Sequence, residues 1–109
     1  MGKNDQLLGT LDLLVLKTLS QVGSMHGYGI VLHIQRVSDD LLRVEEGSLY
    51  PALHRIEEAG WIISEWRKSE NNRRAKFYRL TAQGRKQLAR AEQSWERVVQ
   101  GVGSLLNLA

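Results

Sequence analysis

Residues 61–80, which read WIISEWRKSENNRRAKFYRL, decide the fold because the period of the chain changes here. Two runs rich in β-branched and aromatic residues, 61–67 and 75–80, flank the polar stretch 68–74. This pattern predicts a β-hairpin with a polar connection. The segments on either side of it have helical spacing, so we expect a single hairpin among helices.

Three helices are predicted before the hairpin. The first covers about 7–22, where the apolar stripe is wide enough to need cover on two sides, and a second chain is an expected source of that cover. Ser24 is expected to cap a second helix over about 26–38, with Val37 on its buried side. Because proline is tolerated in a first helical turn, Pro51 places the start of a third helix near residue 47 or 48.

A long helix is predicted after the hairpin, with Thr81 as its cap. We expect it to fray after about Val102, because Gly101 and Gly103 weaken a helix. Its apolar residues step by three and four, as in a heptad seam: Leu88, Ala91, Trp95, Val98, Val102 and Leu105. Such a narrow seam favours pairing with another helix. The predicted fold class is α+β and mainly helical, a winged helix-turn-helix with a long C-terminal dimerisation helix.

The composition suits one small domain with its own core. The chain has 109 residues, of which 42% are hydrophobic and 25% charged. It has no cysteine, which excludes disulfides, thiolate metal sites and a cysteine nucleophile. Its first residues do not resemble a signal peptide, and the apolar stretch that follows is too short to span a bilayer. We therefore expect a cytoplasmic protein.

The charge is more informative in its distribution than in its sum. A net charge of +3 does not by itself indicate nucleic-acid binding. Five cations, however, lie in one ten-residue stretch of the predicted hairpin, where only Glu70 opposes them: Arg67, Lys68, Arg73, Arg74 and Lys76. A charge run is commonly a solvated face. At the tip of a wing beside a recognition helix, it favours contact with DNA phosphates.

The third helix carries polar residues outside its buried stripe of Leu49, Leu53 and Ile56. Ser48 and Tyr50 are able to donate to phosphate, which the free amides of a helix N-terminus also attract. In a helix-turn-helix this helix lies in the major groove, where His54 and Arg55 would reach base edges, with arginine preferring guanine. The alternative is that Tyr50 and His54 only cover the domain surface.

Trp95 allows two interpretations. A packed core tryptophan is the commoner fate of an aromatic residue on an apolar face. Alternatively, the indoles of two copies face each other and sandwich a flat apolar molecule. The residues predicted to line that gap lie on the first and last helices: Leu7, Leu8, Leu11, Leu88, Glu92, Trp95, Val98 and Val99.

No catalytic centre, cofactor or metal site is expected. His26, His33 and His54 are scattered, and none has a partner at metal-ligand spacing. The adjacent acidic pairs at 39–40 and 45–46 suit helix ends. No nucleophile motif or phosphate-binding loop is present. The sequence therefore lacks the catalytic cluster that an enzyme, such as a small hydrolase, would need.

Three strings resemble the PadR family of transcriptional regulators. They are HGYGI at 26–30, EGSLYPALHRIE at 46–57 and RRAKFYRLTAQG at 73–84, with GWI at 60–62 and the pair 94–95 as shorter matches. The resemblance covers nearly the whole chain. The single long C-terminal helix is similar to the short branch of the family, which includes multidrug-responsive repressors.

The resemblance implies a homodimer that binds a palindromic operator in double-stranded DNA, usually as a repressor. It implies that Tyr28 lies at a phosphate. The recognition-helix role would fall to Ser48, Tyr50, Pro51, His54 and Arg55, and the wing role to Arg73, Arg74 and Lys76. Two recognition helices would enter successive major grooves roughly 34 Å apart.

The resemblance also favours a pocket around Trp95 for a small aromatic or apolar effector. One departure bears on it: Val98 and Val99 stand where drug-binding relatives often carry polar or acidic groups. Glu92 then becomes the main candidate counter-charge for a cationic drug, unless the pocket is closed by packing.

The sequence thus predicts a homodimeric, sequence-specific DNA-binding regulator, with residues 1–80 as the winged-helix domain and 81–109 as the dimerisation helix of one compact unit. The alternative is a winged-helix protein–protein interaction module without ligand sensing.

Overall fold

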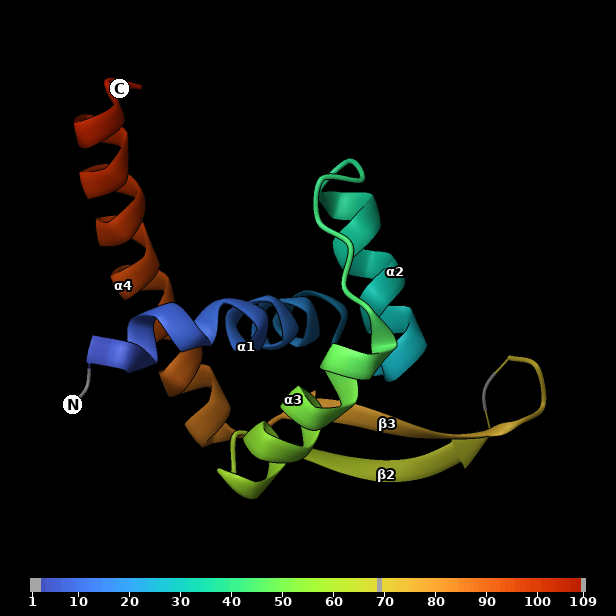
Figure 1. Cartoon of the computed structure of the whole chain (residues 1–109). Helices are drawn as coiled ribbons and strands as arrows, with labels where there is room; N and C mark the ends of the chain where they lie inside the picture. Colours follow the sequence, from blue (N-terminus) through green and yellow to red (C-terminus); the bar gives the residue numbers. More distant parts are fainter. Residues whose placement is uncertain (1–2, 69, 109) are drawn as a thin grey trace.

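The computed structural model describes residues 3–68 and 70–108, with side chains described from residue 10 onward. Within these residues the chain forms helices and one three-stranded sheet (Figure 1). The elements follow in the order α1 (Lys3–Val22), β1 (Ser24–His26), α2 (Gly27–Val37), α3 (Glu46–Glu58), β2 (Ile62–Lys68), β3 (Arg74–Leu80) and α4 (Ala82–Leu106). The predicted fold class, a mainly helical winged helix with a long last helix, is confirmed.

The predicted hairpin is formed by β2 and β3, which pair antiparallel from Ile62 opposite Leu80 to Lys68 opposite Arg74. The sheet order is β1-β3-β2, so β3 is the central strand. The short strand β1 was not predicted, and its presence makes the expected capping role of Ser24 wrong. Ser24 is extended and pairs with Arg79, and His26 caps α2 instead, its Nδ1 accepting the Gly29 N–H at 3.0 Å.

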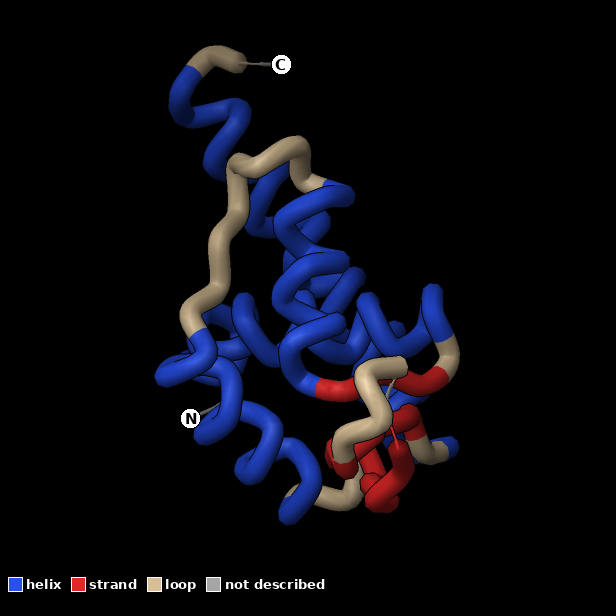
Figure 2. Tube along the Cα trace, turned by 90° about the vertical axis from the view of Figure 1, so that its right-hand side faces the viewer, coloured by secondary structure: helices blue, strands red, loops and turns tan. Residues whose placement is uncertain are grey.

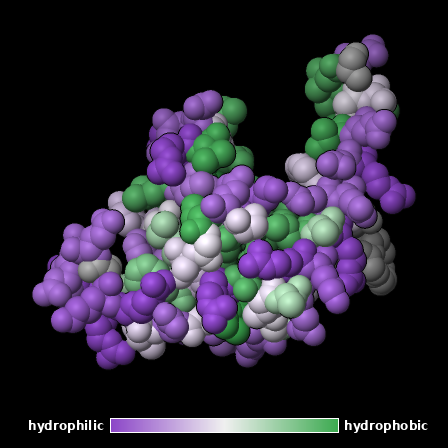
Figure 3. All heavy atoms as spheres, turned by 180° about the vertical axis from the view of Figure 1, so that it is seen from behind, coloured by the Kyte–Doolittle hydropathy of each residue, from purple (hydrophilic) through white to green (hydrophobic). Residues whose placement is uncertain are grey.

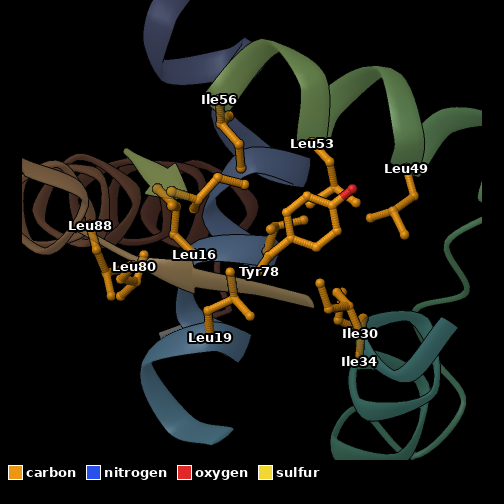
Figure 4. Close-up of a cluster of buried hydrophobic side chains, with 12 residues drawn as sticks. Leu16, Leu19, Ile30, Ile34, Leu49, Leu53, Ile56, Tyr78, Leu80 and Leu88 are labelled. Atoms are coloured by element: carbon orange, nitrogen blue, oxygen red, sulfur yellow. The ribbon is translucent and has the colours of Figure 1, made fainter. Parts of the chain in front are cut away.

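The core forms around the second half of α1. Val15, Leu16 and Leu19 are buried there, and residues of α2, α3, β3 and α4 close around them (Figure 4). Leu49, Leu53 and Ile56 of α3 point into this core as predicted. α1 therefore needs cover on several sides, and the chain itself supplies much of it.

Val37 is 60% exposed, so its predicted burial is wrong. It is the last residue of α2, and the chain leaves the core directly after it. Asp39 and Asp40 follow in the left-handed region, with φ of 52° and 68°. The irregular connection 38–45 then leads to α3 (Figure 2).

The start of α4 is bonded to the turn between α3 and β2. The Thr81 hydroxyl accepts the Gly84 N–H at 3.0 Å and donates to the Gly60 carbonyl at 2.7 Å, which confirms Thr81 as the cap. The Thr81 N–H donates to the Trp61 carbonyl at 3.0 Å. A Cβ at Gly84 would overlap that same carbonyl oxygen, so only glycine allows this close approach.

The expected fraying of α4 after Val102 is wrong. The helix continues to Leu106 and ends at Asn107, which adopts the left-handed cap conformation with φ of 65°. Because helix propagation is cooperative, Gly101 and Gly103 are carried within the helix rather than ending it.

The two ends of the molecule project in different directions (Figure 1). α1 crosses the middle, α4 packs near one end of α1 and rises away from the body, and the β2–β3 hairpin extends at the opposite end. The Cα trace measures 50 × 30 × 23 Å along its principal axes. Among the helices of the described chain, none combines the length and apolar character that crossing a membrane would need.

Candidate nucleic-acid interface

α3 presents an outward face because its buried residues, Leu49, Ala52, Leu53 and Ile56, all lie on the side of the core. Ser48, Pro51 and His54 lie on that exposed face. Glu45, at the N-cap, makes no side-chain bond to the first turn of α3. The first amides of α3 therefore have no side-chain partner in Glu45, while Glu46 places a carboxylate in the same turn.

Tyr50 connects the start of α3 to the start of α2. A Cβ on Gly27 would lie 2.8 Å from the Tyr50 hydroxyl oxygen, so the glycine allows this close approach. Burial, and then the neighbouring Glu46, raise the pKa of Tyr50 above its ordinary value of 10.0. Tyr28 follows Gly27 and is exposed. Two hydroxyl donors thus flank the contact between α2 and α3.

The second half of α3 carries the two residues predicted to read bases, and each is paired with a carboxylate. Arg55 Nη2 donates to Asp12 Oδ1 of α1 at 2.5 Å. His54 Nε2 lies 3.3 Å from a Glu58 carboxylate oxygen one turn along α3. Neither pairing was predicted from the sequence, and Asp12 lies 43 residues before Arg55 in the chain.

Glu57 links α3 to both strands of the hairpin. Its carboxylate accepts the Ser64 hydroxyl of β2 at 2.6 Å and lies 3.8 Å from Lys76 Nζ of β3. Burial raises the pKa of Tyr78, and the charges of Glu57 and then Tyr50 raise it further. The sequence did not predict these contacts of Glu57. No spacing within the helix points to its role, since both partners come from the hairpin.

Aromatic rings hold two of the five hairpin cations. The Arg67 guanidinium lies 4.1 Å from the centre of the Phe77 ring and donates to the Ser24 hydroxyl at 2.5 Å. The Arg74 guanidinium lies 5.3 Å from the centre of the Trp66 ring. Stacking on a ring orders an arginine while its edge stays open to solvent.

The remaining hairpin cations lie near the tip. Lys68 and Arg73 are exposed, and Lys76 lies between Glu57 and solvent. Figure 3 shows the hairpin end as a hydrophilic surface, whereas apolar side chains emerge along the far part of α4. The structure therefore brings the predicted wing cations to one end of the molecule, joined to α3 through Glu57.

The residues predicted to line an effector pocket have different environments. Trp95 is 38% exposed and Val99 is exposed, while Leu11 and Val98 are partly buried. Leu88 belongs to the hydrophobic core, and Glu92 is paired with Lys17 Nζ at 2.7 Å. The side chains of Leu7 and Leu8 lie outside the described residues.

Three helices followed by a basic hairpin define a winged helix-turn-helix protein, a class that binds DNA. Residues 15–90 match the model of the transcriptional regulator PadR-like family. The chain therefore belongs to the PadR-like family of transcriptional regulators, which bind DNA and are not enzymes.

Solved structures and a curated relative agree with this assignment. A transcriptional regulator from Clostridium thermocellum is 30% identical, with a TM-score of 0.80 over 92% of this chain and 96% of that one. A PadR-like transcriptional regulator from Bacillus cereus is also 30% identical, with a TM-score of 0.75 over 94% and 96% of the two chains. A transcriptional regulator from Mycobacterium tuberculosis is 34% identical over 84 residues, which are 77% of this chain and 64% of that protein.

Proposed function

We propose that the protein is a homodimeric repressor that binds a palindromic operator and is released by a flat apolar effector. The observation that carries the DNA part of this proposal is the link between α3 and the hairpin through Glu57. Because of that link, a duplex seated against α3 would meet the wing at a fixed distance. Base contacts and phosphate contacts would then form together.

The contacts divide between the grooves and the backbone. The first half of α3 would enter the major groove with Ser48, Tyr50 and Pro51, and Tyr28 would donate to a flanking phosphate. His54 and Arg55, further along α3, would reach base edges. The phosphate contacts of the wing would come from Lys68, Arg73, Arg74 and Lys76. Residues 1–80 thus act as the DNA-binding part.

Exposed apolar residues on α4 support the homodimer. Val99, Val102, Leu105 and Leu106 are all exposed in the single chain, Leu105 at 84%. A row of this kind on one helix marks an interaction surface, and the heptad spacing suits the same helix of a second copy. Residues 81–109 would therefore form the dimerisation part and set the distance between two recognition helices.

The effector site is proposed beside Trp95 at that dimer interface. The indole is neither fully buried nor free, as expected of one wall of a site that a second copy completes. Because Lys17 already neutralises Glu92, the site suits an uncharged aromatic better than a cationic drug. Leu11, Val98 and Val99 would complete the apolar wall.

A second candidate is a winged-helix module that binds another protein. The connection between α2 and α3 favours it, since Leu41 is 85% exposed and Val37 and Leu42 are exposed nearby. In that case the wing cations would be incidental to function.

A DNA-binding experiment separates the two candidates. Duplexes bound by the full chain are selected from a random pool, and the affinity for the selected duplex is measured against salt. For Arg73→Ala plus Arg74→Ala, we expect the slope of log affinity against log salt to decrease by about one for each lost phosphate contact. Arg90→Ala plus Arg97→Ala removes the same charge from the outward face of α4 and serves as the control. An unchanged slope in the wing variant contradicts the proposed function.

A further inference from the structure

The ion pair between Arg55 and Asp12 joins the proposed recognition helix α3 to α1, which has no proposed contact with DNA. Arg55 lies on α3 and its side chain is 58% exposed, whereas Asp12 lies on α1 and its side chain is 16% exposed. The arginine is therefore accessible to a ligand while its carboxylate partner is mostly covered.

Burial of the carboxylate argues that the pair persists when Arg55 meets DNA. A largely desolvated carboxylate that loses its cation is strongly destabilised, so Arg55 does not exchange Asp12 for DNA at low cost. A guanidinium carries several N–H groups in one rigid plane. With one Nη2 hydrogen on Asp12, the plane is oriented and further donors remain on its exposed side.

The neighbouring pair of His54 and Glu58 provides a contrast. It lies within one helix, and both side chains are at least 70% exposed. Exposed pairs of this type contribute little and fix little. The Arg55–Asp12 pair instead spans two elements, so it defines both where the guanidinium lies and how α3 sits on α1.

We infer that Asp12 is a positioning residue for operator recognition: its carboxylate holds the Arg55 guanidinium in the orientation in which the remaining donors reach a base edge. This inference rests on the proposed function, because it presumes that α3 reads DNA. It assigns a role in specificity to a residue of α1 that does not itself contact DNA.

The test compares the affinity for the duplex selected by the wild-type protein with that for a scrambled duplex of the same length and composition. Asp12→Asn removes a negative charge, which strengthens binding to both duplexes alike and leaves their ratio unaffected. Loss of Arg55 orientation lowers the ratio itself, by about tenfold for one arginine contact. Arg55→Lys keeps the charge but loses the planar fork, and we expect the same decrease.

The double variant Asp12→Asn plus Arg55→Lys decides whether the two residues act through each other. We expect its affinity ratio to equal that of either single variant, and independent, multiplying effects overturn the inference. Glu58→Gln, the matched control, removes an acidic charge from α3 and is expected to leave the ratio unchanged.

Other outcomes also discriminate. A wild-type ratio in Asp12→Asn overturns the inference while the proposed function stands, and a wild-type protein that prefers no duplex overturns both. Thermal unfolding of each variant checks the fold. If Asp12→Asn does not fold, Asp12→Glu replaces it, because moving the carboxylate by one methylene is expected to lower the ratio in a folded protein.

Discussion

The hairpin and the far part of α4 are the two projecting regions of this molecule, and they are stabilised in different ways. Hairpin side chains find partners within the same chain: Arg67 and Arg74 stack on rings, and Ser64 and Lys76 reach Glu57. Beyond Trp95, by contrast, α4 exposes apolar side chains such as Val102 and Leu105. The hairpin is thus ordered by its own chain, whereas α4 exposes the apolar surface that the proposed dimer would bury.

The largest expected effect removes the proposed partner of α4. Val102→Glu plus Leu105→Glu places charges in the heptad seam and is expected to give a monomer. A monomer binds one half-site only, so operator affinity should fall by about 100-fold or more. Sedimentation and DNA binding measure the two effects. Gln100→Glu on the outward face is the control. If Val102→Glu plus Leu105→Glu remains dimeric, the exposed apolar residues of α4 are not the surface through which two copies pair.

The junction of the two regions is expected to be the next most sensitive position. Gly84→Ala forces a Cβ against the Trp61 carbonyl, and such overpacking costs about 1–3 kcal/mol of unfolding free energy. Gly101→Ala, where nothing lies within 4 Å of an added Cβ, is expected to gain up to about 1 kcal/mol. Urea unfolding of both variants tests the contrast, and equal effects at the two glycines contradict it.

Loss of the Glu57 link should loosen the hairpin end without dissociating the proposed dimer. Glu57→Gln weakens the bond from the Ser64 hydroxyl and the attraction to Lys76, at a cost of about 1 kcal/mol in unfolding free energy. Hydrogen exchange is expected to increase in β2 and β3 and to stay unchanged in α4. Faster exchange in α4 would show that the two regions are not separable.

A smaller effect is expected from the ring that holds Arg74. Trp66→Ala removes a stacking contact worth about 0.5–1 kcal/mol at an exposed site, so DNA affinity should fall two- to fivefold. The slope against salt should remain, because the cation itself remains. Trp66→Phe is expected to restore most of the affinity. If it does not, stacking on an aromatic ring is not what orders the Arg74 side chain.

The smallest effect concerns pH. The pKa of Tyr78 is raised in the folded protein, so the folded state holds its proton more tightly than the unfolded chain does. The resulting stabilisation is present below the unfolded value of 10.0 and decreases as pH rises through the folded value. Unfolding free energy should therefore fall above about pH 10. Tyr78→Phe should reduce this fall, and a fall as steep as that of the wild type excludes Tyr78 as its source.

Local patterns predicted most of the fold. Two runs rich in β-branched and aromatic residues located the hairpin, Pro51 placed the start of α3 within two residues, and Thr81 marked the start of α4. Three predictions failed: the capping role of Ser24, the burial of Val37 and the early end of α4. Ser24 is drawn into strand β1 by β3, and α4 continues past its glycines to Asn107.

The candidate site was less predictable, because its decisive contacts join distant parts of the chain. Ser48, Tyr50 and the wing cations were predicted to contact DNA from helical spacing and charge clustering, and that role stays a prediction. The carboxylates of Asp12 and Glu57 were missed, because pairing with Arg55 or Ser64 exists only after folding. A sequence indicates which donors are available, but their orientation depends on acceptors elsewhere in the chain.

The bonds of Thr81 have a consequence for operator length. They attach the first turn of α4 to the segment between α3 and β2, and at Gly84 the helix backbone lies directly against the Trp61 carbonyl. The angle at which α4 leaves each DNA-binding head is therefore built into a single chain before any pairing occurs. In the proposed dimer, the number of base pairs between half-sites would follow from this one rigid joint, and changing it would require altering the joint rather than the helix–helix seam.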